Sequence, residues 1–363
     1  MTAQEPNGDE PGIAQRVTIG LGLYTGQRLG GDGPGLGVEI REIARASEDA
    51  GFDAFWVSEH HGWPDGYLPS PLIALAVAAS ATTTISLGSG VVIAPLHDPI
   101  RLAEDAAVVD QLSGGRLVLG LGVGYLDAEY RMFGVAPSSR GQRLTETVEI
   151  LRTAWRGQTF SYDGSVISLD AVRVTPSPVG DDDIPIWLGG YADAALKRAA
   201  DLADGHLVGR GTPEIVGRAA AALVDCERRP FTFAANLAVV LDAPGGSADV
   251  ARQSFARQQL SYERQQFGVD TYSGLVPPAT GGEALTLGAI SSYLQADGDP
   301  AHLAAVIHRT VALAPPWADV HIVLRAIYAE PDLDVQVERI HALGRLVLPL
   351  VDRAPGPLRR RAP

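Results

Sequence analysis

Three side chains that can exchange protons or bind metal ions stand together in the stretch VSEHHGWPDGYLPSP, residues 57 to 71. Glu59, His60 and His61 follow the apolar run AFWV, which is typical of a buried strand. Histidine changes charge near neutral pH, so a histidine held at the end of a strand can donate and accept protons in a reaction. The alternative is that both histidines only hydrogen-bond the backbone at the start of a helix.

The same spacing argues against a metal site. Successive residues of an extended chain point to opposite faces, so His60 and His61 are poorly placed to share one ion. The sequence contains neither a His-x-His pair nor the H-E-x-x-H pattern of zinc proteases. Its one cysteine, Cys226, excludes an internal disulfide and a multi-cysteine site. We therefore predict no bound metal.

Glycine-rich segments end three of the other apolar runs. They are LGSGVVIAP at 87–95, GLGVGY at 120–125 and LGGYADA at 188–194. The second is not the G-x-G-x-x-G fingerprint of dinucleotide-binding proteins, because Tyr125 stands at the position of the last glycine. The third leads into a predicted helix, and the free N–H groups of a helix start can bind a phosphate that small residues allow to approach. Close packing is the alternative explanation for these glycines.

The elements that must position these segments alternate regularly along the chain. Apolar and β-branched runs predict eight strands with helical patterns between them, and strands that alternate with helices run parallel. About eight such units predict an α/β protein with a single (β/α)8 barrel, although a doubly wound sheet alternates in the same way. The predicted strands are 17–24, 54–58, 85–93, 116–123, 184–189, 206–209, 231–241 and 320–324.

The helix after the third strand has the clearest ends. Asp98 is suited to cap it, Pro99 fits its first turn, and the Gly114-Gly115 pair stops it. The spacing of apolar residues predicts further helices at 38–50, 71–81, 144–155 and 192–203.

Two regions interrupt this alternation. The segment 158–175 contains FSYDGSVISL, whose Asp163-Gly164 pair predicts a hairpin. A longer insertion, from about 243 to 298, follows the seventh strand and contains a polar helical run at 250–266 and a Gly/Pro-rich stretch. Long connections beside an active site are commonly lids, and we expect this insertion to cover the C-terminal face of the barrel.

Composition narrows the choice of partners. The chain has 29 basic and 43 acidic residues, a formal net charge of −14, which disfavours nucleic acid and anionic membranes as partners. No apolar run is long enough to cross a membrane. The acidic start, MTAQEPNGDEPG, does not look like a signal peptide, so we expect a cytoplasmic protein. We expect one domain at 15–351, with flexible tails at 1–14 and 352–363.

Several of these segments, in this order, resemble the bacterial luciferase-like family of flavin-dependent oxidoreductases and monooxygenases, from about residue 17 to about 350. The resemblance rests on GFDAFWVSEHH, on ISLGSGVVIAPLHDPIRLAEDAAVVDQLSGGRLVLGLGVGY with EYRMFGV, and on IPIWLGGYADAALKRAADLADG. It implies the luciferase-like version of the (β/α)8 barrel with an insertion after strand seven. It also implies a homodimer built from helices of the early half of the barrel.

The resemblance assigns roles to individual residues. It implies that His60 stands over the reactive part of the flavin as a proton donor or acceptor, with Glu59 and His61 beside it, and that the Gly90–Val91 peptide is cis and supports one face of the flavin ring. It places Gly122, Gly124 and Tyr125 against cofactor and substrate. An arginine of the luciferase branch is replaced here by Val123, which puts the phosphate contact of that branch in doubt. The cofactor phosphate is expected at Gly189, Gly190, Tyr191 and Ala192.

Three functions are compatible with the resemblance. The first is a two-component monooxygenase that receives reduced FMN from a separate flavin reductase and oxidises a small organic substrate with dioxygen. The second is a hydride-transferring oxidoreductase that uses the deazaflavin coenzyme F420, which the GVGYLDAEYRMFGV stretch, Arg140, Arg143 and Val123 favour. The third is a flavin-binding protein without catalysis, against which the retained His60 argues. The expected substrate pocket consists of Leu23, Tyr24, Trp63 and Tyr67.

Overall fold

The computed structural model describes residues 15–27, 35–180, 183–226, 230–243, 248–267, 293–328 and 332–358. The predicted tail at 1–14, the last five residues, and the Gly/Pro-rich part of the insertion at 268–292 lie outside the described residues. In the described part of the chain, no helix is long and apolar enough to cross a membrane.

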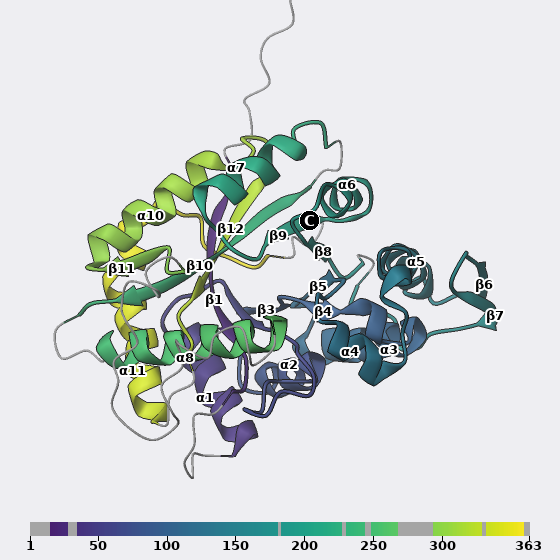
Figure 1. The fold of residues 1–363 in the computed structure, drawn as a ribbon, viewed down its shortest axis with the longest axis horizontal. Coiled ribbons are helices and arrows are strands. Elements are labelled where there is room, and N and C mark those ends of the chain that lie inside the picture. Colours follow the sequence, from purple (N-terminus) through teal and green to yellow (C-terminus); the bar gives the residue numbers. More distant parts are fainter. Residues whose placement is uncertain are drawn as a thin grey trace, which may run out of the picture.

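Eight parallel strands close into a barrel, as predicted (Figure 1). The order around the barrel is β1, β2, β3, β5, β8, β9, β10, β12, and β12 pairs with β1 to complete the ring. This closed ring excludes the doubly wound alternative. The strands of the ring are β1 Val17–Tyr24, β2 Ala54–Val57, β3 Ser86–Ser89, β5 Leu117–Gly122, β8 Ile186–Gly189, β9 Gly205–Val208, β10 Thr232–Leu241 and β12 Asp319–Arg325.

Helices surround the barrel and connect its strands. The best-defined one, α3, has the predicted ends: the Asp98 side chain accepts hydrogen bonds from the N–H groups of Ile100 and Arg101, and Gly114 ends the helix with φ 69°. The α-helices of the described residues are α1 Leu36–Asp49, α2 Pro71–Ala79, α3 Pro99–Ser113, α4 Asp127–Phe133, α5 Arg140–Ala154, α6 Asp193–Leu202, α7 Pro213–Ala222, α8 Ala248–Phe267, α10 Pro300–Leu313 and α11 Leu333–Leu346.

Strand residues alternate between two hydrophobic layers. Leu21 and Phe55 belong to the layer between barrel and helices, whereas Trp56, Trp187 and Val323 fill the barrel interior. Because side chains alternate along a strand, the interior position of one residue predicts that the residue two positions later faces the same way. This rule decides which residues at the strand ends face the mouth of the barrel.

The third predicted strand is divided in two. The sequence predicted a continuous strand at 85–93, but β3 ends at Ser89 and a short strand, β4 Val92–Ile93, follows. The Gly90–Val91 peptide between them is cis, as the resemblance implied, and β4 pairs with β5. A second cis peptide without proline, Gly22–Leu23, was not predicted.

Two excursions leave the barrel where the sequence predicted them. β6 Phe160–Asp163 and β7 Ser168–Val172 form an antiparallel hairpin that projects beyond α5 (Figure 1). Within the insertion, α8 covers the predicted helical run, and the short strand β11 Ala296–Gly298 pairs with the end of β10.

The end of the chain is attached to the N-terminal side of the barrel. The buried carboxylate of Asp53 accepts hydrogen bonds from the Gly356 N–H at 2.7 Å and from Arg353 at 3.1 Å. The Leu358 N–H donates to the Ser86 hydroxyl, and the Leu358 side chain packs against the interior layer. The sequence predicted a flexible tail from 352; residues 353–358 make these contacts, and the boundary between domain and tail stays a prediction.

Candidate active site

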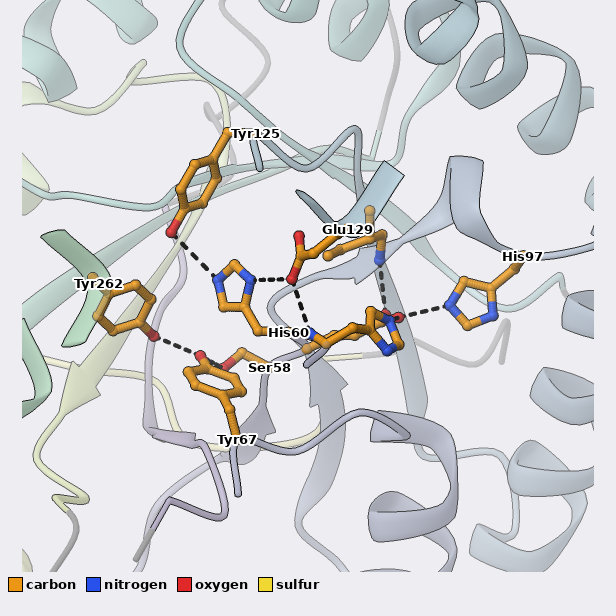
Figure 2. A network of polar contacts seen from close by, with 10 residues as sticks. Ser58, His60, Tyr67, His97, Tyr125, Glu129 and Tyr262 are labelled. Atoms are coloured by element: carbon orange, nitrogen blue, oxygen red, sulfur yellow. Dashed lines mark hydrogen bonds and ion pairs between the residues drawn. The ribbon is translucent and has the colours of Figure 1, made fainter. Parts of the chain in front are cut away.

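His60 lies at the C-terminal mouth of the barrel, just after β2 (Figure 2). It lies at the mouth because its ring contacts Tyr125, which follows β5, and Tyr262 of α8. Its imidazole is buried and stacks on Trp63, with ring centroids 4.6 Å apart. His60 Nδ1 is 2.8 Å from a carboxylate oxygen of Glu129, and Nε2 is 3.4 Å from the hydroxyl of Tyr125.

Glu129, from α4, determines which nitrogen of His60 carries the proton. Its Oε1 accepts the backbone N–H of His61 at 2.8 Å, so it acts as an acceptor there. Nδ1 of His60 therefore donates to the same oxygen, and Nε2 is left to exchange a proton on the Tyr125 side. Glu129 is buried, and among the described residues its second oxygen has no hydrogen-bond partner.

Aromatic rings enclose the rest of the imidazole. Tyr67, Tyr125 and Tyr262 meet its plane edge-on, with ring centroids 4.8, 5.4 and 5.6 Å away. The Tyr67 hydroxyl bonds to the Ser58 and Tyr262 hydroxyls at 2.6 and 2.5 Å. Tyr262 belongs to α8, so the insertion contributes directly to this wall, as Figure 2 shows.

The insertion helix is fastened over the mouth by polar contacts. Gln258 donates to the side chains of Thr25 and Gln27 at 3.1 and 2.8 Å, and the Ser261 hydroxyl donates to Asp65 at 2.8 Å. These bonds join α8 to the loops that follow β1 and β2. The expectation that the insertion covers the C-terminal face therefore agrees with the position of α8.

Glu59 holds a second network, away from the His60 ring. One of its oxygens is 2.6 Å from Nε2 of His61 and 2.8 Å from Nε2 of His97, and the other accepts the Ile93 N–H at 2.8 Å. Burial raises the pKa of Glu59, but the hydrogen bonds of the two histidines and of Ile93 outweigh it and bring the pKa to about 2. Glu59 thus connects the end of β2 to β4, just beyond the cis peptide.

The same three side chains bring their ligand atoms within 4.8 Å of one another, which is close enough for a metal ion. The two N–O distances are those of hydrogen bonds, and hydrogen bonding to Glu59 raises the pKa of His97 despite its burial. The absence of a metal therefore stays a prediction, which metal analysis of the purified protein tests.

Val91 lies over glycines at the ends of β5 and β8. A Cβ atom on Gly122 would come within 2.7 Å of a Val91 methyl group, and one on Gly189 within 3.1 Å. Leu23 lies on the other side of the cis peptide, 3.1 Å from the position of a Cβ on Gly90. Five of the residues expected to contact cofactor or substrate are therefore brought together: Leu23, Gly90, Val91, Gly122 and Gly189.

The turn between β8 and α6 is where the cofactor phosphate is expected, and its role stays a prediction. Gly190 has a φ of 149°, which favours glycine, and a Cβ there would meet Ala195 at 2.6 Å. Ala192 is the N-cap of α6 and is exposed. The carboxylate of Asp193 pairs with Arg218 at 2.6 Å. Tyr191 is 47% exposed.

Tyr24, which was expected in the substrate pocket, has its ring against Phe55 of β2. It is 1% exposed and packs against Phe55 in the layer between barrel and helices, with ring centroids 6.2 Å apart. Its neighbour Leu23 belongs to the interior layer. Adjacent strand residues face opposite sides, so Leu23 and Tyr24 do not both line the mouth.

The sequence profile described as luciferase-like monooxygenase matches residues 20–323. The chain belongs to this family. The matched residues include every strand of the barrel, from within β1 to within β12.

Individual relatives within the luciferase-like monooxygenase family are more distant. The oxygenase component of a flavin-dependent trigonelline monooxygenase from Acinetobacter baylyi is 32% identical over 152 residues, 41% of this chain and 42% of the relative. The chain matches about half the length, or slightly less, of the curated relatives most similar to it.

Solved structures share the fold at lower identity. An F420-dependent secondary alcohol dehydrogenase has a TM-score of 0.70 at 17% identity, with 94% of this chain and all of that chain covered. The oxygenating constituent of 3,6-diketocamphane monooxygenase from Pseudomonas putida, in complex with FMN, has the same TM-score at 16% identity, also with 94% and 100% covered. Because the two TM-scores are equal, similarity of the barrel fold does not indicate whether a protein uses FMN or F420.

Some residues of this luciferase-like site were not predicted as such. Glu129 lies within the EYRMFGV segment and His97 within the VVIAPLHDP segment. Their positions in the sequence do not indicate that they bond to His60 and Glu59. Tyr262 lies in the insertion, where a polar helical pattern carries no signal for an inward-facing tyrosine. Arg325 ends β12, and only the closed barrel reveals that it faces the mouth.

Proposed function

We propose that the protein is the oxygenase component of a two-component system, which uses reduced FMN from a separate flavin reductase to oxidise a small organic substrate with dioxygen. The observation that carries the proposal is the fixed His60 imidazole, with Nδ1 bonded to buried Glu129 and Nε2 directed toward an aromatic-lined mouth. A non-catalytic flavin carrier would not need a histidine held in one protonation pattern.

The residues at the mouth fit a flavin. Tyr125 and Tyr191, at the ends of β5 and β8, are 44% and 47% exposed, and such accessible aromatic rings suit contact with a planar ring system. Val91 and the glycines beneath it provide an apolar surface between these two strands. The N-terminus of α6 suits the phosphate, which distinguishes FMN from riboflavin.

Within this proposal, the residues around His60 have different roles. Bound reduced flavin supplies the electrons. His60 holds a proton-exchanging nitrogen at the mouth, Glu129 fixes the orientation and tautomer of its ring, and Trp63, Tyr67 and Tyr262 exclude water around it.

Titration of the cofactor tests the proposal. Reduced FMN and reduced F420 are compared anaerobically by quenching of protein fluorescence, and dioxygen is then admitted. We expect tighter binding of reduced FMN and consumption of dioxygen. Tighter binding of F420, with no oxygen consumption in the presence of reduced FMN, contradicts it.

Hydride transfer from F420 is the second candidate. The segment GVGYLDAEYRMFGV, Arg140 and Arg143 favour it, as does Val123 in place of the arginine of the luciferase branch. Arg143 lies at the same side of the barrel as β4, since its Nε donates to the Pro95 carbonyl at 3.2 Å.

We expect Ala192→Asp to weaken FMN binding by about tenfold, because it puts a negative charge beside a phosphate at the helix start. Riboflavin is the control, since it lacks the phosphate and should bind the variant as it binds the parent. Affinities are measured by fluorescence titration. An unchanged FMN affinity places the phosphate away from the β8–α6 turn.

We also propose a homodimer formed through α2 and α3, which pack side by side. Ile73 on α2 and Leu112 on α3 are 68% and 60% exposed, which is unusual for large apolar side chains. The double variant Ile73→Asp/Leu112→Asp should be monomeric in light scattering after size exclusion. Val224→Asp, at an equally exposed valine after α7, is the matched control. A wild-type monomer, or a dimeric double variant, contradicts the proposal.

A further inference from the structure

The guanidinium of Arg325 lies at the mouth of the barrel and has no acidic partner in the part of the chain that the structure describes. Arg325 is the last residue of β12, and Val323, two positions earlier, belongs to the interior layer, so Arg325 faces the mouth. Among the described residues no ion pair includes Arg325, and its Nε is buried without a hydrogen-bond partner.

Among the described residues, the groups in direct contact with this cation are neutral, and the Asp65 carboxylate is joined to it through Gln27 and Gln258. One terminal nitrogen donates to the Gln258 side chain, and the guanidinium carbon lies 5.2 Å from the ring centroid of Tyr262 and 5.8 Å from that of Phe255. Aromatic rings and an amide stabilise a cation less than a carboxylate does, and leaving the buried Nε–H of Arg325 without an acceptor costs free energy. A ligand with an acidic group satisfies both the charge and the free Nε.

Arg325 and His60 both lie against the Tyr262 ring, so a substrate bound next to His60 is also near the Arg325 guanidinium. Tyr262 contacts both groups: its ring centroid is 5.6 Å from that of His60 and 5.2 Å from the guanidinium carbon of Arg325. In the barrel, β12 is two strands from β2, on the side away from β8, where the flavin phosphate is expected. A planar fork of N–H donors matches the two oxygens of a carboxylate.

We propose that Arg325 binds a carboxylate of the substrate, so that the substrate is a small organic acid whose body packs against the rings of Trp63, Tyr67 and Tyr262 beside His60. This inference rests on the proposed function, since it assumes that the mouth next to His60 receives a substrate. It adds the chemical class of that substrate and the residue that selects it.

Binding of matched acid and amide pairs tests this inference without turnover. The probes are benzoate with benzamide, nicotinate with nicotinamide, and 2-naphthoate with 2-naphthamide, titrated into the full chain by calorimetry. We expect at least one acid to bind about tenfold more tightly than its amide, as a charge-assisted pair predicts. Arg325→Met should abolish this preference, and Arg325→Lys, which keeps the charge, should retain part of it.

Two controls distinguish a substrate contact of Arg325 from the general loss of a positive charge and from a contact with the flavin phosphate. Arg345→Met, at an arginine paired with Glu338 on α11, should leave the acid preference unchanged. The preference for FMN over riboflavin should be the same in Arg325→Met as in the parent. If that preference is lost, Arg325 holds the flavin phosphate and the inference is wrong.

The inference is also wrong if no acid binds more tightly than its amide, or if Arg325→Met keeps the preference. An acid preference that depends on Arg325 in a protein that fails to consume dioxygen with reduced FMN would support the carboxylate site and contradict only the proposed monooxygenase activity.

Discussion

His60→Asn is expected to lower turnover by about 10²–10⁴-fold, the usual contribution of a positioned acid–base group, while leaving cofactor affinity nearly unchanged. Asparagine keeps a polar group of similar reach but does not exchange protons near neutral pH. The buried imidazole stacks on Trp63 and bonds Glu129, so the substitution acts on the proton-exchanging group and not on the proposed phosphate site. Turnover is measured as product formed per reduced flavin, and affinity by fluorescence titration.

Two companion variants define the origin of this loss. Glu129→Gln keeps an oxygen acceptor for His60 and for the His61 N–H, so it should lose less activity than Glu129→Ala, which removes both bonds. Partial rescue by the conservative variant identifies Glu129 as a positioning residue. Near-normal turnover of His60→Asn together with severe loss in His61→Ala would reverse the assignment of the two histidines.

Glu59→Gln is expected to destabilise the protein by about 3 kcal/mol near pH 6, because a buried carboxylate whose pKa falls from its ordinary 4.5 to about 2 stabilises the folded state by that order. The folded pKa is the lower one, so the wild-type advantage is complete above about pH 4.5 and disappears as the pH falls towards 2. Urea unfolding of both proteins between pH 7 and pH 3 measures it.

The contribution of His97 to stability depends on pH in the opposite direction, because its pKa is raised and not lowered. The pKa of His97 is raised by Glu59, so the stability from this pair is complete below the ordinary pKa of histidine and is lost as the pH rises through the raised value. Glu338→Gln, which removes an exposed carboxylate paired with Arg345, should show little effect at any pH. A Glu59→Gln difference that stays constant from pH 7 to pH 3 would mean that the carboxylate charge contributes nothing.

The barrel could be predicted from the sequence because its signals are local. β1 begins and ends where the apolar run predicts, and α3 has its capping aspartate and terminal glycine in place. The interruption of the third strand was missed because Ile85–Ile93 consists of small and apolar residues throughout, and the cis peptide at Gly90–Val91 divides it. Period-two alternation from Leu21 would have put Leu23 outside the barrel and Tyr24 inside, but β1 is irregular between Leu21 and Tyr24, so spacing alone could not predict which of the two faces the mouth.

The site was less predictable because its contacts join distant segments. His60 and the stretch around it stand out in the sequence, but Glu129 is 69 residues away and Tyr262 is 195 residues from the Tyr67 that it contacts. Arg325 and Gln258 meet only because β12 closes the ring and the insertion folds back over it. Such contacts depend on the tertiary structure, and the spacing of residues along the sequence does not indicate them.

The position of Tyr262 on α8 has a consequence for how such an enzyme diversifies. His60, Glu129 and Glu59 are carried by the barrel and its early helices, whereas one wall of the mouth belongs to a helix inserted after β10. Substitutions in α8 can therefore accumulate and change which molecules are accepted, while the proton-handling half is inherited intact. Within a lineage of related genes, we expect acceptance of new compounds to arise first in this inserted helix.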